Sequence, residues 1–172
     1  MDGNECLLTS IENGVWVDLD GSAHKNKWSW TDQKADDGFL VLDRNGNGII
    51  DNGTELFGSV TPQPPTNSPN GFLALAVYDK PENGGNDDGF IDSRDAIYSK
   101  LRIWVDANHD RYSQPEELHT LRELGVGRIH LQYQFKPRTD EFGNGFSLRS
   151  RVWDFHGNQS GRWAWDVYLR TQ

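Results

Sequence analysis

The chain has 172 residues, which is enough for one domain with a hydrophobic core. Its formal charge of −9 argues against nucleic acid or an anionic membrane as a partner, because both would repel it. A single cysteine, Cys6, excludes an internal disulfide and a cysteine-based zinc site, and no apolar run of roughly eighteen residues is present to span a membrane.

Alternating apolar and polar residues predict short strands toward both ends of the chain. These predicted strands cover residues 14–20, 26–32, 128–135, 146–155 and 162–169. Residues 39–42 are a compact apolar run, and we expect it to be a further strand that enters the loop beginning at Asp43. Polar, Gly-containing turns join the first two and the last two, so we expect a hairpin at each end.

Helical spacing of apolar residues predicts helices in the middle of the chain. A short helix is expected over residues 71–78 and a longer one over residues 93–104. A third is expected from Ser113, a favourable N-cap, to Gly125, a favourable stop. The sequence therefore predicts an α+β fold, with EF-hand-like calcium loops and short helices in the middle and β-hairpins at the N- and C-terminal ends.

We expect one EF-hand-like calcium-binding domain over residues 1–172. Within it, residues 1–35 form an N-terminal β region, residues 36–125 a calcium-loop core and residues 126–172 a C-terminal β region.

The first candidate metal site, loop A, is residues 106–117. It places oxygen donors at positions 1, 3, 5, 7 and 12 of a twelve-residue calcium loop. These donors are Asp106, Asn108, Asp110, the backbone carbonyl of Tyr112, and Glu117. Position 9 is Gln114, and position 6 is Arg111 where Gly usually makes the turn, which costs strain if a left-handed conformation is required. The alternative, a polar turn that binds nothing, does not explain the complete spacing.

Loop B begins at Asp43 and shows the same early pattern, with Gly48 at position 6. Its candidate ligands are Asp43, Asn45, Asn47, the carbonyl of Ile49, Asp51 and Glu55. The expected Glu falls one residue late, at Glu55. Either the loop closes with one extra residue or Asp51 supplies the anionic closure.

Loop C ends with Gly89 at position 6, which makes Asp95 position 12. Position 1 would then be Gly84, which has no ligand side chain, so we take Asp79 as the first ligand, followed by an insertion at residues 80–84. The candidate ligands are Asp79, Asn86, Asp88, the carbonyl of Phe90, Asp92 and Asp95.

Other acidic groups carry weaker signals. Asp18 and Asp20 fit a turn after a strand about as well as a cation site, and the pair Asp36–Asp37 indicates little. The five His residues lack zinc spacing, and no nucleophile triad, phosphate loop or dinucleotide fingerprint is present. The alternating Trp residues near the C-terminus favour strand packing over a sugar platform.

Three stretches together resemble a known family. They are residues 35–58 (ADDGFLVLDRNGNGIIDNGTELFG), residues 70–76 followed by residues 88–92 (NGFLALA, DGFID), and residues 101–125, which begin LRIWVDANHD. They are similar to the calcium-dependent self-processing module of bacterial RTX proteins, the FrpC type, and to related secreted bacterial calcium-binding proteins. That resemblance implies two to three bound calcium ions, a secreted protein, and self-cleavage at an Asp-Pro bond just before the module.

No proline of this chain follows an aspartate, so we expect no self-cleavage within it and assign no catalytic residue. We expect a secreted bacterial domain, monomeric and not inserted in a membrane, whose loops bind calcium and thereby stabilise the fold. No signal peptide is visible. Two alternatives stay open. One is a self-processing module whose scissile bond lies upstream, and the other is a calcium-assisted module that binds a glycan or protein surface.

Overall fold

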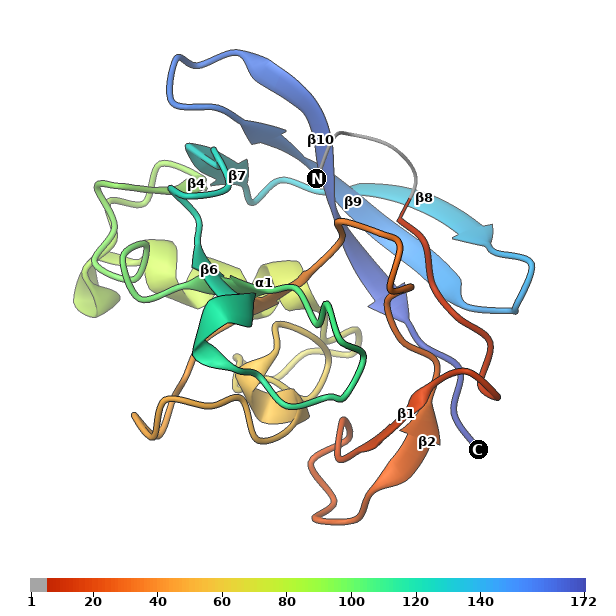
Figure 1. Cartoon of the computed structure of the whole chain (residues 1–172). Helices are drawn as coiled ribbons and strands as arrows, with labels where there is room; N and C mark the ends of the chain where they lie inside the picture. Colours follow the sequence, from red (N-terminus) through yellow and green to blue (C-terminus); the bar gives the residue numbers. More distant parts are fainter. Residues whose placement is uncertain (1–5) are drawn as a thin grey trace.

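The computed structural model describes residues 6–172. Within this range ten strands form three antiparallel sheets, and one short α-helix is present. Figure 1 shows the long C-terminal strands as one sheet beside a middle region built mostly of loops. No helix of the described residues is long and apolar enough to cross a membrane.

The smallest sheet is an N-terminal hairpin of β1 (Val15–Val17) and β2 (Asn26–Trp28). Val15 and Val17 are buried whereas Trp16 is exposed, as the two-residue period of a strand requires. The alternation of apolar and polar residues in the sequence therefore indicates which face of this hairpin packs on the core.

The second sheet has the order β3–β5–β6 and positions two of the three candidate metal loops. Its strands are β3 (Phe39–Val41), β5 (Arg102–Trp104) and β6 (Leu118–Thr120). An aromatic cluster covers it, in which Trp30 lies 4.7 Å from Phe39 and 5.5 Å from Trp104 between ring centroids. Trp30 and Trp104 are fully buried, so this cluster fixes the two strands that lead into the loops.

The third sheet has the order β10–β9–β7–β4, with β8 also paired to β9. Its strands are β4 (Phe90–Asp92), β7 (Arg128–His130), β8 (Gln134–Thr139), β9 (Gly145–Trp153) and β10 (Gln159–Tyr168). The predicted C-terminal hairpin is thus present as β9 and β10. The short strand β4 joins the middle of the chain to this sheet by pairing with β7.

Helical structure is confined to short segments. The α-helix α1 (Gly71–Ala76) begins where the Asn70 side chain accepts a hydrogen bond from Leu73 N, and it continues as the 3-10 helix η2 (Val77–Asp79). The other 3-10 helices are η1 (Gly53–Glu55), η3 (Pro81–Asn83) and η4 (Pro115–Glu117).

The prediction of an α+β fold with EF-hand-like helices is wrong, because the chain is mostly β. No helix forms over residues 93–104, which contain turns followed by β5. Ala96 N donates to Gly84 O, outside the segment, and Tyr98 N donates to Asp95 O, only three residues back. Turns therefore form in place of a regular i to i−4 ladder.

The predicted helix from Ser113 to Gly125 is also absent. Ser113 Oγ accepts a hydrogen bond from Ile50 N in another loop instead of capping a helix. Residues 115–120 form η4 and then β6. Gly125 does stop a turn in the left-handed conformation, with φ of 69°. The apolar spacing marks residues that face the core, but it does not make a helix here.

Candidate metal centre

Loop A is the connection of a β-hairpin rather than of two helices. It follows β5 and precedes β6, whose residues Trp104 and Leu118 are directly paired. Val105 N donates to Glu117 O at 3.0 Å, which closes the loop just outside Asp106. Antiparallel pairing brings the two ends of the loop together, which is what a wrapping loop needs.

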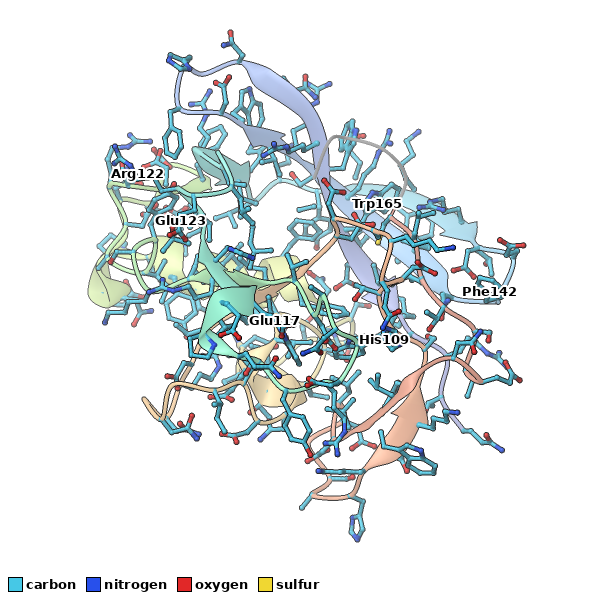
Figure 2. The ribbon with its side chains drawn as sticks, in the orientation of Figure 1. His109, Glu117, Arg122, Glu123, Phe142 and Trp165 are labelled. Atoms are coloured by element: carbon cyan, nitrogen blue, oxygen red, sulfur yellow. The ribbon has the colours of Figure 1, made fainter. Side chains whose placement is uncertain are left out.

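Three carboxylates of loop A meet at one point. Asp106, Asp110 and Glu117 each offer an oxygen, and these oxygens lie within 4.8 Å of one another. Asp106 and Glu117 are 3% and 4% exposed, so two of the three charges are removed from water. Like charges this close repel unless a cation lies between them, so the arrangement suits a divalent ion. Figure 2 labels Glu117 and the neighbouring His109 in this middle region.

Hydrogen bonds hold these carboxylates in place. Asp106 accepts from Asp110 N at 3.1 Å and from Arg111 N at 2.9 Å. Glu117 Oε1 accepts from Ala107 N at 3.0 Å. The hydrogen bond from Tyr112 N is the main reason that the pKa of Asp110 is lowered, so this exposed carboxyl stays charged.

Two buried tryptophans also donate hydrogen bonds to these carboxylates, and the sequence analysis did not predict these contacts. Trp30 Nε1 donates to Asp106 Oδ2 at 2.8 Å, and Trp104 Nε1 donates to Glu117 Oε2 at 3.4 Å. Trp30 is 76 residues from Asp106 in the chain, so no local pattern reports this contact. These indole groups orient the carboxylates from outside the loop.

The backbone of loop A is left-handed at positions 4 and 6. His109 has φ of 61° and Arg111 has φ of 66°, so the strain expected for Arg111 is present. The Arg111 guanidinium lies 4.5 Å from the Tyr112 ring centroid and donates to Tyr112 Oη at 2.9 Å, which offsets part of that cost. Of the other predicted donors, Asn108 Oδ1 accepts from Asp110 N and Tyr112 O accepts from Gln114 N.

Loop B repeats this design with one additional residue. Asp43 accepts from Asn47 N at 3.2 Å and from Gly48 N at 2.8 Å, as Asp106 does from its own positions 5 and 6. Leu42 N donates to Glu55 O, the counterpart of the Val105–Glu117 closure, so Glu55 occupies the place of Glu117.

Both candidate closing carboxylates of loop B lie at the loop. Glu55 is 2% exposed, and its oxygens accept from Arg44 N and Asp51 N. Asp51 is exposed and accepts from the amide groups of Asn45 and Asn47, each at 2.8 Å. The Ile49 side chain is exposed.

Loops A and B contact each other at their eighth positions. Ile50 N donates to Ser113 Oγ at 2.7 Å, between residues 63 apart in the chain. Ile50 and Ser113 are both buried. The two loops are therefore coupled, so that ordering one favours ordering the other.

Loop C starts from Asp79, at the end of η2. Asp79 accepts from Asp88 N at 3.2 Å and from Gly89 N at 2.9 Å, which is the same position 1 geometry despite the inserted residues. Asn86 Oδ1 accepts from Asp88 N, and Phe90 N donates to Asp88 Oδ1. The structure thus brings Asp79 next to Asp88 and Gly89 across the insertion, but within the described residues three acidic groups meet closely only in loop A.

The end of loop C is partly neutralised by a cation of the protein. Arg94 forms ion pairs with Asp88 and, at 2.6 Å, with Asp92, and it lowers the pKa of Asp92. Asp95 is 4% exposed and one of its oxygens has no hydrogen-bond partner among the described residues. Burial is the main cause that raises the pKa of Asp95. A metal ion would have to compete with Arg94 for Asp88 and Asp92.

Asp18, one of the weaker candidates from the sequence, lies in a turn whose hydrogen bonds resemble those at the start of loops A, B and C. Asp18 accepts from Ser22 N at 3.1 Å and Ala23 N at 3.0 Å, and Ala23 has φ of 65°. Asp20 accepts from Ser22 N as well. The turn after β1 is therefore ordered by its own carboxylates.

A separate cavity of about 430 Å³ lies along β10 and away from loop A. Its lining includes Cys6 and Leu8 from the start of the described chain, and Asp166 from β10. Burial raises the pKa of the Cys6 thiol to about 12, so it is not a reactive thiolate. Burial also raises the pKa of Asp166, whose Oδ1 accepts from Gly71 N at 3.0 Å.

Comparison with known protein families shows which family the chain belongs to. A family model described as the SPM domain matches residues 1–169. The chain belongs to the SPM, or self-processing module, family. It is 40% identical over 148 residues to the iron-regulated protein FrpA of Neisseria meningitidis serogroup C. That match covers 86% of this chain and 12% of FrpA, so the SPM domain spans a small part of this relative. The family resemblance drawn from the sequence is confirmed.

Proposed function

We propose that this SPM domain binds calcium through loops A, B and C, about three ions, and that the bound calcium stabilises the fold. The observation that supports it most is the meeting of Asp106, Asp110 and Glu117 oxygens within 4.8 Å, with two of these side chains buried. Oxygen donors alone, without His or Cys, suit calcium better than zinc or copper.

The geometry also supports a role for the ion in stability. Loop A closes the β5–β6 hairpin, and the same strands pack against the aromatic cluster around Trp30. Without a cation, repulsion among the carboxylates would act directly on this part of the core. We propose that a calcium-rich, extracellular environment supplies the ion, and that residues 1–172 act as one monomeric domain.

Terbium luminescence tests binding at loop A. Trp30 and Trp104 donate hydrogen bonds to the proposed ligands Asp106 and Glu117, so excited tryptophan lies close enough to sensitise bound terbium. We expect terbium emission on tryptophan excitation that calcium displaces, and that Glu117→Gln weakens strongly. No sensitised emission from the folded protein would contradict the proposal.

A second candidate function follows from family membership, namely calcium-dependent cleavage of a bond upstream of the described residues. Cys6 and Leu8, at the start of the described chain, line the cavity beside β10 together with Asp37 and Asp166. Extending the chain with a natural upstream segment that contains an Asp-Pro bond, and following its mass after adding calcium, tests this function. A stable mass would reject it.

A further inference from the structure

Basic side chains outnumber acidic ones in residues 126–172, which form most of the C-terminal sheet. Residues 126–172 hold seven Lys or Arg and four Asp or Glu, whereas residues 1–125 hold ten and 22. The chain therefore has a basic C-terminal part on an acidic remainder. A basic surface on an otherwise acidic chain points to an acidic partner.

Arginine and aromatic side chains alternate across strands β9 and β10. Trp163 pairs directly with Arg151, and Trp165 pairs with Arg149. The Arg149 guanidinium lies 3.9 Å from the Trp163 ring centroid and 5.5 Å from that of Trp165. The Arg151 guanidinium lies 6.0 Å from the Trp163 ring centroid. Figure 2 labels Trp165 on this sheet.

Arg138 of β8 continues the row. Its guanidinium lies 5.2 Å from the Trp165 ring and 3.7 Å from the Phe146 ring. A second group on the same sheet places Arg128 at 4.8 Å from Phe90 and 5.0 Å from Trp153. We call Arg128, Arg138, Arg149 and Arg151, with the rings they contact, the arginine–aromatic ladder.

The ladder arginines are held by rings and not by carboxylates. Among the described residues, none of these four has an ion pair, although the chain carries an excess of acids. Arg151 is exposed, and Arg128, Arg138 and Arg149 are partly exposed. Stacking fixes each guanidinium plane and leaves N–H groups at its edge to bind an anion.

We propose that the arginine–aromatic ladder is a binding surface for an acidic polysaccharide, a linear glycan whose sugars carry carboxylate or sulfate groups. This goes beyond calcium binding and does not depend on it. Arg149 and Arg151 point from the same face of β9, two residues or about 7 Å apart, so the surface matches a polymer with repeated charges better than a single small anion.

The acidic remainder of the chain selects against more densely charged polymers. Duplex DNA carries about one charge per 1.7 Å, so repulsion from residues 1–125 would act on many phosphates at once. The sulfate and carboxylate groups of an acidic polysaccharide are spaced more widely along the polymer than the phosphates of duplex DNA, so it meets less repulsion. The partly exposed edges of Trp163 and Trp165 also offer apolar contact to sugar C–H groups.

Titration with heparin in millimolar calcium tests the proposal. We expect the wild-type protein to bind heparin and the double variant R149Q/R151Q to bind at least about tenfold more weakly. The matched control K25Q/K34Q removes the same charge at exposed lysines outside the sheet and is expected to bind like the wild type. The variant R149K/R151K keeps the charge but not the planar stack, and we expect intermediate affinity.

Equal heparin affinity for R149Q/R151Q and K25Q/K34Q, with unchanged melting temperatures, would overturn the proposal. So would tighter binding of polyphosphate or polyglutamate than of heparin, because the surface would then fit a different class of anion. Loss of terbium binding at loop A with retained heparin binding would refute the calcium proposal and leave this one standing.

Discussion

The calcium-loop core and the C-terminal sheet treat charged side chains in opposite ways. In loop A three carboxylates converge, so their mutual repulsion has to be balanced by a cation. In loops A, B and C alike, the first aspartate is oriented by backbone N–H groups. In the C-terminal sheet, arginines are separated by aromatic rings that already stabilise them. The stability of the first region is therefore expected to depend on calcium and that of the second on packing.

The largest effect is expected from Phe146→Ala in the C-terminal sheet. Phe146 is 2% exposed and packs on Trp165 and Arg138, so its removal leaves a cavity and costs about 3–5 kcal/mol. The melting temperature should fall by roughly 6–20 °C at every calcium concentration. A loss that varies strongly with calcium would show that this sheet is not independent of the loops.

Glu117→Gln should change the response to calcium itself. Removing the closing carboxylate of loop A should weaken calcium binding by at least about tenfold, or ~1.4 kcal/mol. Melting scans over a calcium series should show the transition shifted to higher calcium. Its neighbour Glu116 is exposed and outside the cluster, so Glu116→Gln serves as the control and should leave the series unchanged.

Ser113→Ala tests the contact between loops A and B. It removes the acceptor for Ile50 N and leaves a buried N–H without a partner, which costs about 1 kcal/mol and roughly 2–4 °C. Ser150→Ala removes one hydrogen bond, to Gln132 O, in the C-terminal sheet. We expect only Ser113→Ala to reduce the cooperativity of calcium binding, and equal calcium curves for both variants would contradict the coupling.

Asp166→Asn should give a small gain in stability. Burial raises the pKa of Asp166 in the folded state above its ordinary value of 3.8, so ionisation disfavours folding as pH rises through that raised value. The variant should melt about 2 °C higher than the wild type at pH 7.5 and show no difference near pH 4.

Asp154, in the turn between β9 and β10, has a lowered pKa, so its substitution is expected to change stability in the opposite direction. Hydrogen bonding from Asn158 N is the main cause that lowers its pKa, so its charge favours the fold. Asp154→Asn should therefore lower the melting temperature at pH 7.5. A rise for both variants would indicate a general effect of net charge.

The sequence was sufficient for the strands near both ends, because two-residue alternation reports directly which face is buried. It was misleading for residues 93–104 and 113–125, where apolar residues at helical spacing reach the core from turns and short strands. The order of donors in each loop is local and was visible, including the interrupted loop C. The contact of Trp30 with Asp106 joins segments 76 residues apart, so no spacing in the sequence could show it.

Melting the protein in EDTA and in millimolar calcium, with magnesium as the comparison ion, tests whether bound calcium holds the loops together. We expect a large rise in melting temperature with calcium, a smaller one with magnesium, and a further rise as calcium increases. The same melting temperature in EDTA and in calcium would contradict the claim that the carboxylates of loops A, B and C are held together by bound calcium.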